Sequence, residues 1–267
     1  MIKPRTLLGK WLQLSDPHCG HLVGLTHPEK WSGPDTKWGR TQRQCWNFFT
    51  ESVDKHKPFD VVHINGDLTA GKNKKQGARQ LLTADMKEQA QIAVEAIRQA
   101  ECKKIRICRG TPYHVGSDDA WEDVAVLQLK EAGISDVGIC NHGFYRFCGK
   151  NVDVKHKLAS SGIPHGRTGP LAKEILWNRI WHLHKGQALS DLTIRSHVHY
   201  FQMIRDDGCI GVSTPSLQGL GDDHAEQAYS GTVDFGIVVF YFWDDGSIEV
   251  VPEIMKGVIS AGSVEEL

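Results

Sequence analysis

The sequence predicts an α/β layered fold, either with one mixed β-sheet or with two sheets that carry helices on their outer faces. Short apolar segments alternate with segments of helical periodicity through the first two-thirds of the chain. The last third is expected to be mainly β, with a hairpin around an Asp-Asp-Gly turn. The chain has 267 residues, of which 40% are hydrophobic and 24% charged, so it can build a sizeable core of ordinary globular composition.

The expected strands are short apolar or alternating segments bounded by turn-forming residues. The first, residues 7–14, is followed by Asp16-Pro17-His18, and the next, residues 59–64, is followed by Gly66-Asp67. Further strands are expected at residues 104–108, 143–148, 151–156, 192–195, 209–213, 234–243 and 247–253.

Helices are expected where apolar residues recur every three or four positions. Trp46, Phe49 and Val53 show this spacing in the first helix. Further helices are expected at residues 85–100, 121–132 and 171–185. Residues 19–40 form a long connection for a compact domain, and we expect an irregular loop there, a candidate lid. We predict a single domain over residues 1–267, with a β segment over residues 200–267.

Charge and cysteine content narrow the class of protein. The formal net charge of −1 argues against a protein that coats nucleic acid non-specifically, because such proteins are basic overall. The seven cysteines are odd in number and form no Cys-x-x-Cys pair, which argues against a disulfide framework and a thiolate zinc site. No apolar run approaches the ~20 residues that span a bilayer. We therefore expect a cytoplasmic protein without a membrane segment.

Potential metal ligands follow the ends of several predicted strands. They are Asp16, His18, Asp67, His156, His197 and His199. Small molecules and ions bind to α/β proteins beyond the carboxyl ends of the strands. These residues are therefore expected to lie close together although they are distant in sequence. Mixed imidazole and carboxylate ligands suit zinc, manganese or iron. The sequence therefore predicts a metal site.

The order Asp-x-His, Gly-Asp, His, His-x-His resembles the calcineurin-like metallophosphoesterase superfamily between about residues 12 and 199. The resemblance implies a four-layer α/β/β/α sandwich of two mixed β-sheets flanked by helices. It also implies two divalent metal ions, for which we expect Mn²⁺, with Zn²⁺, Fe or Ni²⁺ as alternatives. One ion would be held by Asp16, His18 and His199, and the other by His156 and His197, with Asp67 as the bridge.

The sequence departs from the family's Gly-Asn-His motif at Gly110-Thr111-Pro112-Tyr113-His114. Thr111 stands where the family has an asparagine ligand, so we predict a threonine oxygen as the ligand of the second metal. His114 stands two residues later than the family's catalytic histidine. We predict that His114 donates a proton to the leaving group or binds phosphate. The nearby Asn141-His142 pair lies outside the family order and is treated as a coincidence.

The expected reaction is two-metal hydrolysis of a phosphodiester by a metal-bound hydroxide, with Asp67 and His114 in catalytic roles. Arg109 and Lys72 are candidate phosphate contacts. Basic residues at 71–79 favour a nucleotide or nucleic-acid substrate. Trp31 and Trp38 would either stack on its bases or pack on the body of the protein. No protein partner can be inferred.

Three alternatives stay open at this point. The same site suits a phosphomonoesterase, acting on a protein or a small molecule. The altered turn at Gly110 to His114 leaves room for a non-catalytic scaffold with a degenerate site. A metal-dependent amide hydrolase uses similar ligands, but its His-x-His comes early in the chain and here it comes late.

Overall fold

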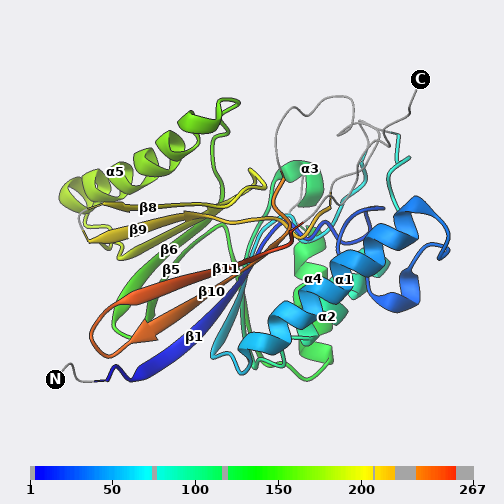
Figure 1. The fold of residues 1–267 in the computed structure, drawn as a ribbon, viewed down its shortest axis with the longest axis horizontal. Coiled ribbons are helices and arrows are strands. Elements are labelled where there is room, and N and C mark those ends of the chain that lie inside the picture. Colours follow the sequence, from blue (N-terminus) through cyan, green and yellow to red (C-terminus); the bar gives the residue numbers. More distant parts are fainter. Residues whose placement is uncertain (1–3, 74–76, 116–119, 207, 220–232, 257–267) are drawn as a thin grey trace.

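Two β-sheets face each other and carry helices on their outer sides (Figure 1). The computed structural model describes residues 4–73, 77–115, 120–206, 208–219 and 233–256. The six-stranded sheet has the order β11-β10-β1-β2-β3-β4, and the five-stranded sheet has the order β5-β6-β7-β9-β8. This arrangement confirms the predicted sandwich of two mixed sheets flanked by helices.

The first sheet combines parallel and antiparallel strands. Its members are β1 (Leu7–Leu14), β2 (Val61–Asn65), β3 (Lys104–Cys108), β4 (Asp136–Cys140), β10 (Gly236–Trp243) and β11 (Ile248–Ile254). Strands β1 to β4 are mutually parallel, and β10 pairs antiparallel with both β1 and β11. The carboxyl ends of β1 to β4 therefore meet at one edge, where ligand-bearing loops can converge.

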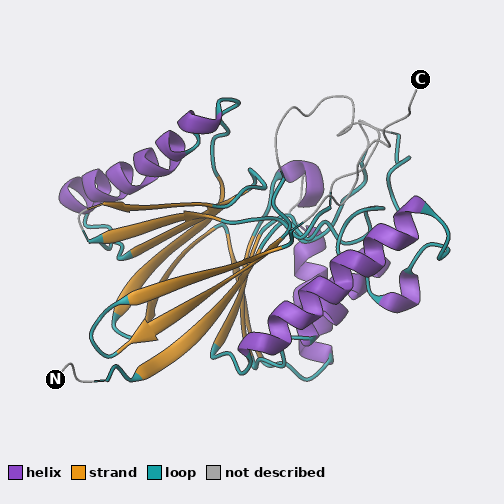
Figure 2. Ribbon diagram, in the orientation of Figure 1, coloured by secondary structure: helices purple, strands orange, loops and turns teal. Residues whose placement is uncertain are grey.

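The outer face of the first sheet is covered by helices (Figure 2). They are α1 (Lys37–His56), α2 (Met86–Arg98) and α4 (Ala120–Glu131), and the short α3 (Pro112–Val115) precedes α4. Thr36 and Asp85 cap the N-termini of α1 and α2. Phe49 of α1 and Ala93 of α2 are fully buried. These helices and the sheet enclose one hydrophobic core.

The second sheet packs against the inner face of the first. It consists of β5 (His142–Phe147), β6 (Lys150–Lys157), β7 (Leu192–Ser196), β8 (Gln202–Asp206) and β9 (Cys209–Ser213). Val154 and Ile194 meet Trp11 and Phe240 in a core between the sheets. Helix α5 (Thr168–Lys185) lies outside this sheet against β8 and β9. The four layers that the resemblance implied are all present.

The sequence-based assignment missed two strands and short helical turns. Strand β4 contains Gly138, which weakens a strand signal, and β8 is an exposed edge strand without clear alternation. After residue 200 the described residues include the strands β8 to β11, whereas residues 220–232 and 257–267 of the predicted β segment lie outside the described residues. No helix of the described residues is long and apolar enough to cross a membrane.

Part of the predicted loop at residues 19–40 is ordered against the body of the protein. It contains the 3-10 helix η1 (Pro28–Lys30), and α1 begins at Lys37, earlier than expected. Val23 and Leu25 are buried. Trp31 packs against the first core, and its indole N–H donates to the Thr26 carbonyl. Trp31 therefore packs on the body of the protein, one of its two expected roles, whereas base stacking and the lid stay predictions.

A fully buried histidine gives the fold a predicted sensitivity to acid. His63 stacks on Trp11, and burial, reinforced by the positive charge of Arg106, lowers its pKa from 6.5 to about 3. Between pH 6.5 and 3 the unfolded chain binds a proton that the folded chain does not, so stability falls as pH falls. We expect this residue to remove about 2.5 kcal/mol of unfolding free energy between pH 7 and pH 4.5.

Urea denaturation of the wild type and His63→Phe at both pH values checks this expectation. The variant should lose less stability on acidification. His184→Phe, a change of the same kind at an exposed residue of α5, is the matched control. Equal acid sensitivity of the wild type and His63→Phe would contradict the assignment.

Candidate metal centre

Six potential metal ligands converge where strands of the two sheets end. The first sheet supplies Asp16 and His18 after β1 and Asp67 after β2. The second sheet supplies His156 near the end of β6, and His197 and His199 after β7. Each sheet thus contributes three ligands, as expected if the carboxyl ends of parallel strands meet at one site.

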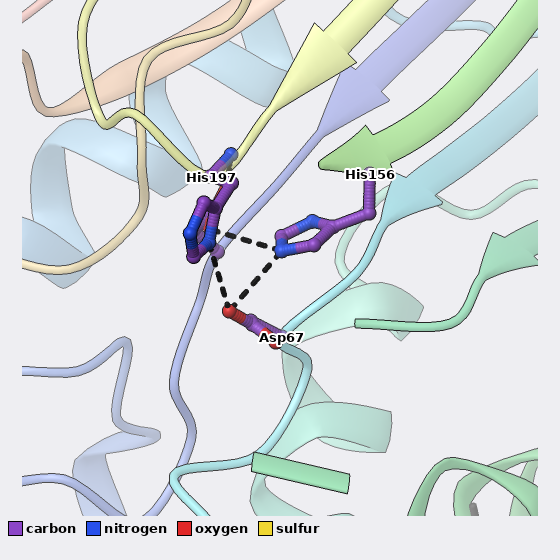
Figure 3. Close-up of side chains that lie close together, drawn as sticks. Asp67, His156 and His197 are labelled. Carbon is purple, nitrogen blue, oxygen red and sulfur yellow. Dashed lines mark hydrogen bonds and ion pairs between the residues drawn. The ribbon is translucent and has the colours of Figure 1, made fainter. Parts of the chain in front are cut away.

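One group of ligands surrounds the Asp67 carboxylate (Figure 3). Asp67 Oδ2 lies 3.2 Å from His156 Nε2 and 3.8 Å from His197 Nδ1. Asp16 Oδ1 is 3.9 Å from the same His156 nitrogen. Four side chains therefore present nitrogen or oxygen atoms within reach of one cation.

A second group lies beside the first and shares Asp16. Asp16 Oδ1 is 3.2 Å from His199 Nε2 and 4.0 Å from His18 Nε2. The geometry therefore brings together the same three residues that the resemblance assigned to one ion. It differs in one respect, because Asp16 also reaches the group around Asp67.

Buried atoms without hydrogen-bond partners test whether these residues fit a metal. Among the described residues, Asp16 Oδ1, both ring nitrogens of His18, His156 Nε2 and His197 Nδ1 are buried and make no hydrogen bond. Native proteins rarely leave such groups unsatisfied, because each costs free energy. His156 Nδ1 donates to the Asn65 carbonyl, 2.6 Å away, which orients the ring so that its Nε2 faces the cluster. The donor set therefore fits divalent cations.

The ligand loops adopt an unusual backbone conformation. Asp16, His18, Asp67, His197 and His199 all have positive φ angles, between 43° and 75°. Non-glycine residues rarely adopt this left-handed region, and clusters of them occur at functional sites. Hydrogen bonds from Asp16 N to Gly66 O and from His18 N to Asp67 O, each 3.1 Å long, hold the first two loops together. The protein itself therefore holds the ligands in place.

The glycine at residue 66 is required by close approach. A Cβ at this position would collide with the His156 ring and would lie 2.9 Å from Gly110 Cα, and its φ of 79° also favours glycine. Gly66 thus allows the two sheets' ligands to approach each other.

Charges within the site favour an anionic Asp67 beside cationic His156. Burial alone would raise the pKa of Asp67, but His156 and His197 hold it well below its usual value. Burial likewise opposes a charge on His156, but Asp67 and Asp16 raise its pKa to about 10. The carboxylates thus create a strong local negative potential, which suits a cation.

The Gly110 to His114 turn lies against Asp67. The Thr111 backbone N–H and hydroxyl donate to Asp67 Oδ1 over 2.6 Å and 3.1 Å. This pair of bonds leaves Asp67 Oδ2 to face the histidines. Thr111 therefore orients the carboxylate, whereas metal ligation by its hydroxyl stays a prediction.

His114 points one ring nitrogen into the site. Its Nδ1 donates to the Ala70 carbonyl at 3.0 Å, and its Nε2 lies 3.9 Å from Asp67 Oδ2. Its ring centre is 4.4 Å from that of His18. His114 is thus brought to the cluster despite its displaced position in the sequence.

The two predicted phosphate contacts are engaged elsewhere. The Arg109 guanidinium makes bonds of 2.8 Å and 2.9 Å to the Asp123 carboxylate. The Lys72 ammonium lies over the Trp121 ring, 5.6 Å from its centre. Phosphate binding by Arg109 would require it to leave Asp123, and both assignments stay predictions. Lys74 and Lys75 lie outside the described residues.

Sequence reasoning missed Glu122, a fully buried carboxylate beneath the site. Its two oxygens accept the backbone N–H groups of Leu68 and Gly110 at 3.1 Å and 3.0 Å. Burial raises its pKa to about 8, against the effect of these N–H groups. Glu122 therefore braces the turns that carry Asp67 and Thr111. A glutamate in the first turn of a helix is usually exposed, so its sequence position gave no signal.

Comparisons with known proteins place the chain beside solved structures at low sequence identity. No protein-family model and no curated protein matches it. A vacuolar protein sorting 29 from Cryptosporidium parvum is 11% identical, with 94% of this chain and 99% of that one covered and a TM-score of 0.46. A novel archaeal phosphodiesterase is 11% identical, with 91% and 99% covered and a TM-score of 0.45. A conserved predicted phosphoesterase from Streptococcus pneumoniae is 10% identical, with 96% and 97% covered and a TM-score of 0.42.

Proposed function

We propose that this protein is a metal-dependent phosphoesterase that hydrolyses phosphodiesters. The observation that carries the proposal is the cluster of six imidazole and carboxylate ligands, several of whose buried atoms make no hydrogen bond. Divalent ions in such a cluster supply Lewis-acid stabilisation of a phosphoryl group and activation of a water molecule. The expected ion is Mn²⁺, with Zn²⁺, Fe or Ni²⁺ as alternatives.

The residues of the chain have separate tasks in this reaction. Asp16 and Asp67 would hold the cations, and their charges set the negative potential of the site beside His156 and His199. Thr111 and Glu122 fix the turns around Asp67 through hydrogen bonds. Rigid support of this kind matters because a misplacement of about 1 Å lowers rates about 100-fold.

His114 is suited to the proton transfer. The Ala70 carbonyl retains the proton on Nδ1, so Nε2 is the atom that gives and takes a proton at the site. Protonated Nε2 faces the region between Asp67 and His18, where a leaving-group oxygen would depart.

Metal add-back to the chelated protein tests the proposed function. Bound metal and hydrolysis of bis(p-nitrophenyl) phosphate are measured after addition of Mn²⁺, Zn²⁺, Fe²⁺ or Ni²⁺. Metal-dependent diester turnover is the expected result. A strong preference for p-nitrophenyl phosphate would instead favour the phosphomonoesterase. Bound metal without turnover of either ester would favour a non-catalytic scaffold, which the engagement of Thr111 with Asp67 makes worth testing.

The His114→Ala variant should reveal the proton donor through the choice of leaving group. We expect turnover of a diester with an alcohol or nucleoside leaving group to fall about 100-fold or more. Turnover of bis(p-nitrophenyl) phosphate should fall much less, since p-nitrophenolate departs without a proton. Steady-state rates on both esters measure the difference, with His184→Ala as the exposed control. Equal losses on the two substrates would remove His114 from the donor role.

A further inference from the structure

One flank of α5 carries four residues spaced four apart, Lys173, Trp177, Trp181 and Lys185. Residues four apart on a helix lie one above the other, about 6 Å apart along the axis. We call these four residues the α5 ladder. The helix is anchored to the second sheet by other positions, Leu171 and Ile175, which are buried. The ladder therefore runs along a flank that does not hold the helix in place.

The two tryptophans of the ladder are unusually open to solvent. Their exposures are 46% for Trp177 and 47% for Trp181. Large aromatic side chains are usually buried, and a contiguous exposed pair marks an interaction site. Lys173 and Lys185 at the two ends are exposed, and within the described ranges the structure pairs neither with a carboxylate. The flank thus presents aromatic faces between two positive charges.

A cleft of about 360 Å³ lies between the tryptophans of the ladder and the outer face of the second sheet. Its floor is polar. Buried Arg195 makes two 3.0 Å bonds to the Asp153 carboxylate and one of 2.9 Å to Glu174. Lys155 bonds the same Glu174 carboxylate at 2.8 Å. The charges of the floor balance, so the two ladder lysines give the region a net positive charge.

We propose that the α5 ladder and its cleft bind single-stranded nucleic acid. Bases would stack on Trp177 and Trp181, and phosphates would lie beside Lys173 and Lys185. Proteins that bind single strands combine aromatic stacking surfaces with positive charge in this way. An apolar protein partner fits less well, because the floor of the cleft is charged and lysines occupy both ends.

The ladder is connected to the metal centre through the strands beneath it. On the floor of the cleft, Lys155 directly precedes His156 in β6, and Arg195 of β7 lies two residues before His197. Helix α5 follows the carboxyl end of β6 and leads back to the start of β7, so Lys173 is the end of the ladder nearer the metal centre (Figure 1). The role of the ladder in holding a substrate for the metal centre rests on the proposed function, whereas its binding of single-stranded nucleic acid does not.

The test is binding of fluorescein-labelled oligothymidylate and oligouridylate, measured by anisotropy in buffer with a chelator. We expect saturable binding of the single strands and weaker binding of duplex. Trp177→Ala with Trp181→Ala should raise Kd about tenfold or more. Lys173→Ala with Lys185→Ala should reduce the slope of log Kd against log salt by about 1.4. Preference between the two oligonucleotides decides between DNA and RNA.

Matched variants on α5 itself and on a helix of the opposite outer layer separate the effect of the ladder from general effects. Leu183→Ala, at an exposed position of α5, and Lys130→Ala, at an exposed position of α4, should leave Kd unchanged. Wild-type binding that is unaffected by the double tryptophan variant, or absent, would overturn the proposal. Self-association through α5 in sedimentation, lost in that variant and without oligonucleotide binding, would overturn it in favour of a protein contact.

Hydrolysis of bis(p-nitrophenyl) phosphate distinguishes failure of this inference from failure of the proposed function. The small diester needs no ladder, so its turnover should be the same in the wild type and the ladder variants. Oligonucleotide binding without any diester turnover would refute the phosphodiesterase and leave the binding surface standing.

Discussion

Asp67→Asn is expected to lower metal-dependent hydrolysis of bis(p-nitrophenyl) phosphate by about 10³-fold or more, equivalent to ~4 kcal/mol. The substitution replaces the oxygen that faces His156 and His197 with an amide N–H₂ group, which cannot bind a cation. The other side-chain oxygen can still accept the two bonds from Thr111. Asparagine also tolerates the positive φ of this position. The variant should therefore fold and lose activity.

Two measurements distinguish loss of metal from loss of structure. Bound metal, determined after dialysis, should fall in Asp67→Asn, while the far-UV circular dichroism spectrum should remain that of the wild type. Loss of the buried pair with His156 should lower the free energy of unfolding without metal but leave the fold in place. Asp136→Asn makes the same chemical change at the surface ion pair with Arg106 and should retain both metal and activity. Full turnover by Asp67→Asn would refute the proposed centre.

Gly110→Ala is the second change with a large expected effect. A Cβ at residue 110 would collide with the Asp67 backbone nitrogen and carboxylate, and would lie 2.7 Å from Asp67 Cα. Because some of these contacts are with backbone atoms, either the loop after β2 that carries Asp67 or the Gly110 to His114 turn has to move. We expect a destabilisation of about 3 kcal/mol and a fall in turnover of about 100-fold from the displaced carboxylate.

Urea denaturation and steady-state kinetics check both parts of this expectation. Gly162→Ala is the matched control, because a Cβ there meets no atom within 4 Å. That variant should remain within about 0.5 kcal/mol of the wild type. An unchanged free energy of unfolding in Gly110→Ala would show that the two loops do not pack as closely as the structure has them.

The convergence of the ligands was predictable from sequence because of where the strands end. Asp16 and Asp67 lie two residues after the ends of β1 and β2, and His197 directly follows β7; parallel strands bring such positions together. The layers were also predictable, because the spacing of apolar residues along the chain indicates which segments are strands and which are helices.

What the sequence did not reveal depends on contacts between distant segments. The pairing of Arg109 with Asp123 and the bonds of Glu122 beneath Asp67 arise from how α4 packs. From its sequence context Trp31 is an aromatic residue in an irregular loop. Its partial burial depends on a core formed by residues that are distant in sequence. No local pattern encodes these arrangements, because each is fixed only when the sheets and helices assemble.

The equal division of the ligands between the two sheets has a consequence for how the protein comes apart. With cations bound, neither sheet could separate from the other without giving up three ligands of the shared cluster. Metal binding that requires the assembled sheets raises the activation barrier to unfolding as well as the equilibrium free energy of unfolding. The metal would then cross-link the two sheets. Its removal would increase the rate at which the whole sandwich unfolds, in addition to abolishing activity at the site.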